Sequence, residues 1–199
     1  NNNVYSPMAY HHRLRRLYSS TINKTNKQCY EIRFSEMPRN FSFVSKNVAG
    51  SSLPDSREAM ENFVTIGITD IITVMEQPLD NTAYSDLPLR FHWYKVKDRM
   101  PPSTDQMLQI MAICDKNERK ILVHCLGGVG RTATVLAAHL MWSKGLSRQD
   151  ALKPLLDHRR TILASSQTDF LTTWFAKCLT AREEHLNITG VAKPPSAQI

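Results

Sequence analysis

Residues 123–132, VHCLGGVGRT, decide how the rest of this chain is expected to fold. They contain one cysteine, an arginine six positions later, and three glycines among the five residues between the two. The stretch begins inside the apolar run KILVHC, residues 120–125, which is typical of a strand covered on both faces. It continues into TATVLAAHLMW, residues 132–142, which is apolar on nearly every side and predicts a buried helix. The sequence therefore predicts a buried strand, a glycine-rich loop and a central helix in succession.

Strand and helix patterns alternate on both sides of this stretch. The other strand candidates are residues 29–34, 41–44, 70–76 and 89–96. Helices are expected to open at Pro54, Asp55 and Glu58, at Ser103 with a capping box to Gln106, and at Ser147 with Asp150, and a last helix carries an apolar stripe from Phe170 to Cys178. Pro154 lies inside the third of these helices and should kink or shorten it. This pattern predicts an α/β domain with a central, mostly parallel, twisted sheet flanked by helices.

The glycine-rich loop has the composition of an anion site. Glycines permit positive φ values and place no Cβ in the way of a phosphate, so successive N–H groups can point inward around it. The amino terminus of the following helix adds unpaired donors and a positive dipole end. Arg131 can close the ring with a bidentate fork. The predicted phosphate-binding residues are Leu126, Gly127, Gly128, Val129, Gly130 and Arg131. A loose turn beside a buried thiol remains the alternative at this point.

The positive potential of such a loop would also act on Cys125. It favours the thiolate, which is the nucleophilic form of the side chain and could attack a phosphoryl group. Thr132 could donate its hydroxyl to the sulfur and ease its departure afterwards. His124 lies on the buried strand and should point away from the phosphate, so it is not expected to act as a base.

Cys-x5-Arg followed by Thr and preceded by His, between a strand and a helix, resembles the signature of the cysteine-dependent protein tyrosine phosphatase superfamily. The similarity extends over about residues 40–182, although Ala133 stands where the family usually has glycine. The resemblance implies the protein tyrosine phosphatase-like fold, with Cys125 as nucleophile and Arg131 as phosphate ligand. It also implies that no metal and no other cofactor is needed.

The family's mechanism requires a carboxylic acid on a loop to protonate the leaving oxygen. The segment VKDRMPPS supplies Asp98, 27 residues before Cys125 and just ahead of a Pro-Pro turn and a capped helix. This placement is similar to the acid loop of the small dual-specificity phosphatases. Gln167 resembles the glutamine that positions the hydrolytic water in related enzymes. Its alternative role is that of a polar residue in the first turn of the last helix.

The substrate class follows from comparing the loop with branches of the superfamily. LGGVG has no lysine, unlike loops of phosphoinositide phosphatases, and it lacks the His and Asn of RNA triphosphatase loops. The chain therefore resembles an atypical, small dual-specificity phosphatase that acts on phosphotyrosine, with phosphoserine and phosphothreonine as further options. Lys97 and Arg99 flank the acid and favour an acidic phosphoprotein. An RNA 5′-phosphatase or triphosphatase and a phosphate-binding pseudophosphatase are the alternatives.

Length and composition fit one domain with extensions at both ends. The chain has 199 residues, 42% of them hydrophobic, and a formal net charge of +7. We expect a polar, basic extension over residues 1–28, a phosphatase domain over 29–183 and a tail over 184–199. The basic extension favours anionic partners, nucleic acid among them.

The cysteines and the apolar runs bear on location. Four scattered cysteines without a CxxC pair favour a reducing compartment, so the cytoplasm is expected, with the nucleus as a second option. Cys114 and Cys178 lie on apolar helical stripes and are expected in the core. The sequence contains no run of 18 apolar residues, so no membrane span is expected.

Overall fold

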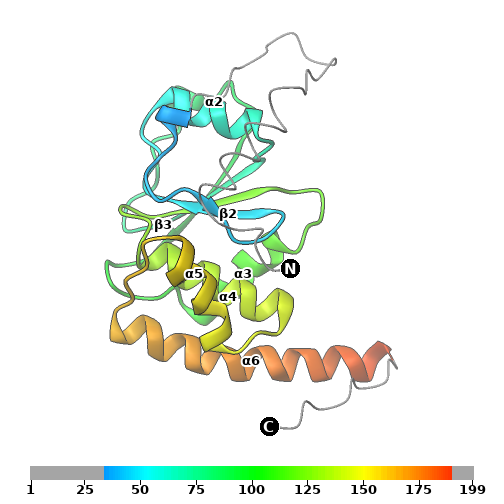
Figure 1. Cartoon of the computed structure of the whole chain (residues 1–199). Helices are drawn as coiled ribbons and strands as arrows, with labels where there is room; N and C mark the ends of the chain where they lie inside the picture. Colours follow the sequence, from blue (N-terminus) through cyan, green and yellow to red (C-terminus); the bar gives the residue numbers. More distant parts are fainter. Residues whose placement is uncertain (1–33, 190–199) are drawn as a thin grey trace.

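The computed structural model describes residues 34–189, which form a five-stranded sheet between two layers of helices (Figure 1). The strands are β1 (Ser42–Phe43), β2 (Val48–Ser51), β3 (Asp70–Met75), β4 (Arg90–Lys95) and β5 (Ile121–His124). Their order is β1-β2-β5-β3-β4. Only the pairing of β1 with β2 is antiparallel. The expected α/β architecture with a mostly parallel sheet is confirmed.

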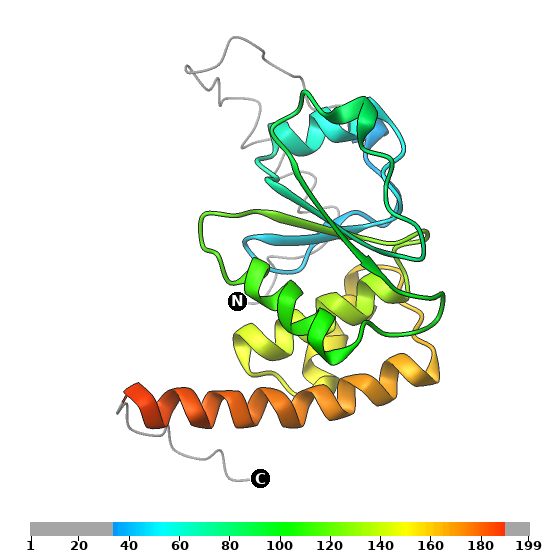
Figure 2. The ribbon, with the colours of Figure 1, turned by 180° about the vertical axis from the view of Figure 1, so that it is seen from behind.

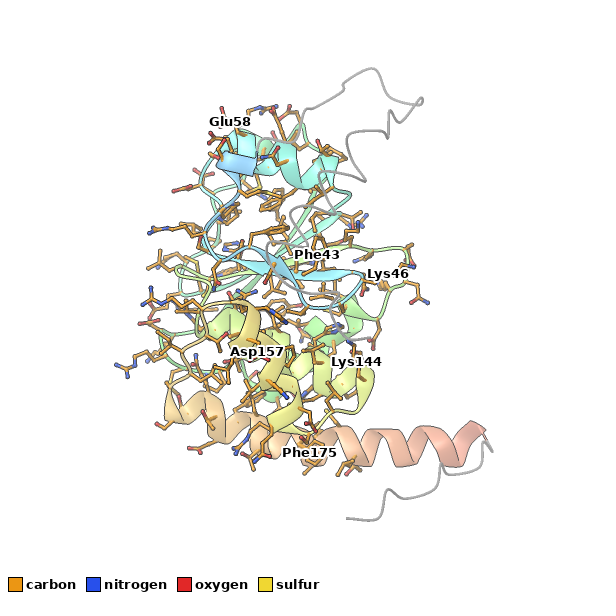
Figure 3. All side chains as sticks on the ribbon, viewed as in Figure 1. Phe43, Lys46, Glu58, Lys144, Asp157 and Phe175 are labelled. Atoms are coloured by element: carbon orange, nitrogen blue, oxygen red, sulfur yellow. The ribbon has the colours of Figure 1, made fainter. Side chains whose placement is uncertain are left out.

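The helices are distributed unevenly over the two faces of the sheet. They are α2 (Arg57–Thr65), α3 (Thr104–Cys114), α4 (Arg131–Lys144), α5 (Arg148–His158) and α6 (Ser165–Thr189), with short 3-10 turns η1 (Phe34–Glu36) and η2 (Thr82–Tyr84). Helix α2 covers one face, and α3 to α6 lie on the other, with α6 outermost (Figures 1 and 2). In Figure 3, Glu58 of α2 and Phe175 of α6 accordingly lie on opposite sides of Phe43 in β1.

Helix α4 lies at the centre of the larger layer, as its sequence predicts. Every residue from Arg131 to Met141 is buried. The helix packs against β2 and β5 on one side and against α5 and α6 on the other. Burial on all sides explains why an amphipathic stripe is absent from its sequence. It also fixes the position of its amino terminus, which receives the chain directly from the glycine-rich loop.

Strand β2 is one element that the sequence does not predict. Its residues, Val-Ala-Gly-Ser, are all buried, yet most of them have low strand propensity. The tertiary packing demands small side chains here. A Cβ on Gly50 would lie 2.6 Å from Leu136 Cδ1 and 2.8 Å from Thr132 Cγ2, both on α4. The close approach of α4 to the sheet therefore selects glycine at a position where propensity would disfavour a strand.

Several local expectations differ from the structure. The N-cap of α2 is Ser56, whose side chain accepts a hydrogen bond from the Ala59 N–H, so the helix opens after Pro54 and Asp55. Phe34 belongs to η1 and not to a strand, while residues 29–33 lie outside the described part. Helix α6 continues to Thr189 and so includes the first residues of the expected tail. Helix α5 continues past Pro154 to His158, so the proline does not end it.

The core confirms the expectation for two cysteines. Cys114 and Cys178 are both buried among the apolar side chains between the sheet and α3 to α6. Burial raises the pKa of the Cys114 thiol to about 12, so this group stays protonated at neutral pH. In the described part of the chain, no helix has the length and apolar character needed to cross a membrane.

An ion cluster around a buried carboxylate stabilises the end of the sheet remote from the glycine-rich loop. Asp70, at the start of β3, is fully buried and accepts hydrogen bonds from Arg90 at 3.0 and 2.8 Å and from Arg119 at 3.1 Å. His92 and Thr69 also contact its carboxylate. Burial alone would raise the pKa of Asp70, but these hydrogen bonds outweigh it and hold the pKa well below its usual range. The ionised carboxylate therefore stabilises the folded state.

We expect Asp70→Asn to lower the free energy of unfolding at pH 7 by about 3 kcal/mol, because Arg90 and Arg119 lose their buried partner. Since the folded pKa is depressed, the wild type should be stabilised by Asp70 above the unfolded pKa of about 4 and should lose this contribution as the pH falls further. Urea unfolding at pH 7 and at pH 3 measures both effects. Asp86→Asn, at an exposed ion pair with Arg57, is the control and should change little. Equal sensitivity of both variants would contradict the interpretation.

Candidate phosphate-binding and catalytic site

The sequence-predicted residues meet at the carboxyl ends of the parallel strands. Cys125 directly follows β5, Asp98 lies three residues after β4, and the glycine-rich loop leads from β5 into α4. Strand β5 is the middle strand of the sheet. In open α/β sheets, this edge is where ligands generally bind. The topology thus brings the thiol, the loop and the acid to one place.

The amino terminus of α4 differs from those of three other helices. Serine side chains cap α2, α3 and α5, at Ser56, Ser103 and Ser147 respectively. The capping box predicted for Ser103 and Gln106 is present. Helix α4 begins after Gly130, and no side chain caps it. Its first N–H groups therefore remain available to an anion, together with the positive end of the helix dipole.

Gly128 sets the shape of the loop. Of the three loop glycines, it is the one with a positive φ, 68°. A Cβ at this position would lie 2.5 Å from the backbone of Ser51 at the end of β2. Gly130 has a φ of −109°, and a Cβ on Gly127 would meet nothing closer than Val129 Cγ2 at 3.7 Å. The strict need for glycine therefore falls on Gly128.

Gly128→Ala should destabilise the fold by at least about 2 kcal/mol, because it combines a left-handed conformation with a backbone clash. Displacement of the loop should also lower kcat/KM for an aryl phosphate by about 100-fold or more. Gly127→Ala is the matched control, because its Cβ has room. Thermal unfolding and steady-state kinetics on both variants test this. Similar losses in the two variants would show that the left-handed conformation and the backbone clash at Gly128 are not the cause of the loss.

The loop carbonyls are held by groups outside the loop. Leu126 O accepts from Leu53 N at 3.1 Å, and Val129 O accepts from Ile162 N at 2.9 Å. Gly128 O accepts from two side chains, Asn40 Nδ2 and Arg159 Nη2, each at 2.8 Å. Gly130 O accepts within α4, from Thr134. With its carbonyls bound in this way, the backbone of the loop is fixed, as an anion-binding loop of main-chain N–H groups requires.

Asn40 and Arg159 are residues of the site that the sequence does not reveal. The side chain of Asn40 also joins Arg160, through bonds to its N–H and its carbonyl, and Asn40 itself has a φ of 59°, which asparagine tolerates. Arg159 is 7% exposed and also donates to Ser42 Oγ. Burial lowers the pKa of Arg159 to about 10, and the nearby Cys125 sulfur opposes this shift. In the sequence, Arg159 is only one of two arginines after a helix.

Cys125 is buried at the base of the loop, with 3% of its surface exposed. The Gly128 N–H donates to its sulfur at 3.3 Å. Thr132 Oγ1 is buried and has no protein partner in the described part of the chain. His124 Nε2 lies 2.7 Å from Thr73 Oγ1 on β3, and burial lowers the pKa of His124 to about 4. His124 is therefore a neutral structural residue of the sheet.

Arg131 and Asp98 form the other side of the site. Arg131 is 6% exposed, and its Nη1 donates to Val96 O at 3.0 Å. Its Nη2 lies 3.1 Å from Asp98 Oδ1. The Asp98 side chain is 71% exposed, so the carboxyl group reaches solvent above a buried guanidinium. The predicted phosphate ligand and the predicted acid are thus in direct contact.

Gln167 lies beside both loops. It is 1% exposed, and its Nε2 donates to Met100 O, two residues after Asp98, at 3.2 Å. A Cβ on Gly130 would lie 3.3 Å from its Oε1, which places the amide against the glycine-rich loop as well. The structure therefore brings every sequence-predicted site residue to one location.

Comparison with protein families and curated proteins agrees with this geometry. Residues 38–185 match the model of a family described as PTP-SAK, Swiss Army Knife protein, DSP-PTPase phosphatase domain. Dual specificity protein phosphatase 26 of Homo sapiens is 32% identical over 106 residues, 49% of each chain. Cyclin-dependent kinase inhibitor 3 of Rattus norvegicus is 36% identical over 80 residues, 38% of each chain. The chain thus spans less than half the length of these curated relatives.

A solved structure, Tk-PTP in the active form, is similar over nearly its whole length. The TM-score is 0.63 with 27% identity, and the match covers 69% of this chain and 97% of Tk-PTP. The fold similarity therefore extends over more than two thirds of this chain.

Proposed function

Since the chain belongs to the DSP-PTPase phosphatase family of the cysteine-dependent protein tyrosine phosphatase superfamily, we propose that it hydrolyses phosphate monoesters on proteins through a phosphocysteine intermediate. One arrangement supports this proposal above all. The loop between β5 and α4 is held by its carbonyls, with the Cys125 sulfur at its base and Arg131 in contact with Asp98. The candidates for nucleophile, anion site and acid lie together, which supports an active phosphatase over a pseudophosphatase.

In the first step, Cys125 Sγ attacks the phosphorus, and the bond between phosphorus and the leaving oxygen breaks. Asp98 gives its proton to that oxygen, so the protein hydroxyl leaves neutral. The loop N–H groups from Leu126 to Arg131 and the Arg131 guanidinium hold the charge on the three non-bridging oxygens. Their preorganisation should supply most of the catalysis, because these donors need no rearrangement during the reaction.

In the second step, water attacks the phosphorus, and the Asp98 carboxylate takes the proton that the water releases. The bond between phosphorus and sulfur breaks, Sγ leaves as a thiolate, and inorganic phosphate is formed. The Thr132 hydroxyl, buried and without a protein partner in the described residues, is placed one residue after Arg131 to donate to the departing sulfur. Each group returns to its starting state.

The proposed substrates are phosphotyrosine and, in addition, phosphoserine and phosphothreonine. A side-by-side assay of phosphotyrosyl peptide, phosphoseryl peptide and RNA with a 5′-triphosphate end tests the proposal. We expect phosphate release from the tyrosyl peptide. Release from RNA alone would support the RNA alternative, which the name of the dual-specificity relative does not favour. Binding of phosphate without any release would indicate a pseudophosphatase.

The proposal also includes a preference for acidic phosphoprotein substrates. Lys97 and Arg99 are exposed on both sides of Asp98, where they would meet acidic residues next to the phosphate. We expect kcat/KM for an acidic phosphopeptide to fall as ionic strength rises from low to physiological. Lys97→Gln with Arg99→Gln should flatten this dependence, whereas Lys177→Gln on α6 should not. A flat wild-type response would remove the acidic preference.

Partners and location stay predictions. The basic segment expected to attract nucleic acid, residues 1–28, lies outside the described residues. A cytoplasmic location is supported by Cys114 and Cys125, which form no disulfide in the described part of the chain.

A further inference from the structure

The loop that carries Asp98 is bound to the first turn of α6 by two side chains. Ser166 Oγ donates to Arg99 O at 2.8 Å, and Gln167 Nε2 donates to Met100 O at 3.2 Å. These are the two carbonyls that directly follow Asp98. On the other side of Asp98, Arg131 Nη1 donates to Val96 O at 3.0 Å. The backbone is therefore held on both sides of the acid.

Gln167 is itself fixed by α6. Its Oε1 accepts from Ala164 N at 3.0 Å, which is the hydrogen bond that the third residue of a helix makes to the capping residue in a capping box. Both ends of its amide group are thus engaged, and the side chain is 1% exposed. A buried amide with both ends hydrogen-bonded has little freedom to move, so its bond to Met100 O also restricts the loop that carries Asp98.

The loop needs such support. Asp98 is 71% exposed, so its own side chain contributes little packing that could position it. Arg99 has a φ of 60°, a conformation that costs a non-glycine residue about 1–2 kcal/mol and persists where surrounding contacts hold it. Among the described residues, the backbone on either side of Asp98 and the contact with Arg131 determine where the Asp98 carboxyl group lies.

We propose that Gln167, with Ser166, is a positioning residue for the general acid: it anchors the loop so that Asp98 reaches the leaving oxygen. This inference rests on the proposed phosphatase function. It differs from the expectation that Gln167 positions the hydrolytic water, because only an anchor of Asp98 affects the first step. An anchor acts through Asp98 when the leaving group departs and again when water attacks, whereas a water-positioning residue acts only on the phosphocysteine.

The kinetic test uses Gln167→Ala with two substrates, phenyl phosphate and p-nitrophenyl phosphate, which have a poor and a good leaving group. We expect kcat/KM for phenyl phosphate to fall by about 10- to 100-fold, because protonation of the leaving oxygen is impaired. The fall for p-nitrophenyl phosphate should be below about threefold, because this leaving group needs little protonation. Thr168→Ala, which removes a hydroxyl bonded to Ala164 O in the same turn, is the matched control and should leave both values unchanged.

A double-mutant cycle with Asp98→Asn tests whether Gln167 acts through the acid. We expect Gln167→Ala to cause no further loss for phenyl phosphate once Asp98 is replaced. Additive losses would overturn the proposal. An unchanged kcat/KM together with accumulation of phosphoenzyme in a burst experiment would also overturn the proposal. Because kcat/KM reports only the steps up to phosphocysteine formation, this result would show that Gln167 positions the water.

Hydrogen exchange of the wild type and both variants supplies a measurement independent of activity. Gln167→Ala should speed exchange of the Met100 amide, which is bonded to Lys97 O within the loop, and Thr168→Ala should not. Unchanged exchange in Gln167→Ala would overturn the anchor. If the wild type released no phosphate from any substrate, the proposed function would fail, and the exchange result would still decide whether Gln167 holds the loop.

Discussion

Replacing Cys125 by serine is expected to lower kcat for an aryl phosphate by about 10⁴- to 10⁶-fold. The serine hydroxyl is not ionised at neutral pH and is a far weaker nucleophile than a thiolate. No other described residue can substitute for it, because the sulfur alone lies at the base of the loop, where the Gly128 N–H contacts it. The measurement is single-turnover and steady-state kinetics on purified wild type and variant.

Binding should survive this change. The loop N–H groups and Arg131 do not depend on the sulfur for their positions, since the loop carbonyls are held by Leu53, Asn40, Arg159 and Ile162. Tungstate or phosphopeptide binding to Cys125→Ser, measured by calorimetry, is therefore expected to remain within a few-fold of wild type. Turnover within tenfold of wild type would contradict the assignment of Cys125, and loss of binding would show that the sulfur shapes the loop.

Replacing Asp98 by asparagine is expected to lower kcat/KM for phenyl phosphate by about 10²- to 10⁴-fold. Asparagine keeps the size of the side chain and an oxygen that can accept from Arg131, so the ring around the phosphate should persist. What is lost is the proton. The effect should shrink strongly for p-nitrophenyl phosphate, whose leaving group departs without one.

Asp105→Asn is the control for this experiment. Asp105 is an exposed carboxylate in the first turn of α3, close in sequence to Asp98. Its replacement should leave the kinetics of both substrates unchanged. An equal loss for both leaving groups in Asp98→Asn would show that Asp98 acts through the position of Arg131 and not as an acid.

The residues around the phosphate could be predicted because they share one short segment. A strand, a glycine-rich loop and a helix follow one another between residues 120 and 144, so local chain geometry suffices to place Cys125, Gly128 and Arg131. Asp98 is separate in sequence, and its assignment depended on the resemblance to a family. The structure brings it to Arg131 because β4 and β5 run in the same direction and end at the same edge.

Sequence alone thus determined the order of the elements and the chemistry of the loop, because hydrophobic periodicity and glycine content are local properties of the chain. Tertiary structure alone decided which residues fix that chemistry in space. Asn40 and Arg159 lie far apart in the sequence, and each donates a hydrogen bond to the backbone of the glycine-rich loop. Gln167, which the sequence suggested only for a different role, donates to the backbone of the acid segment. Backbone acceptors are the same for every residue type, so such bonds leave no pattern in the sequence.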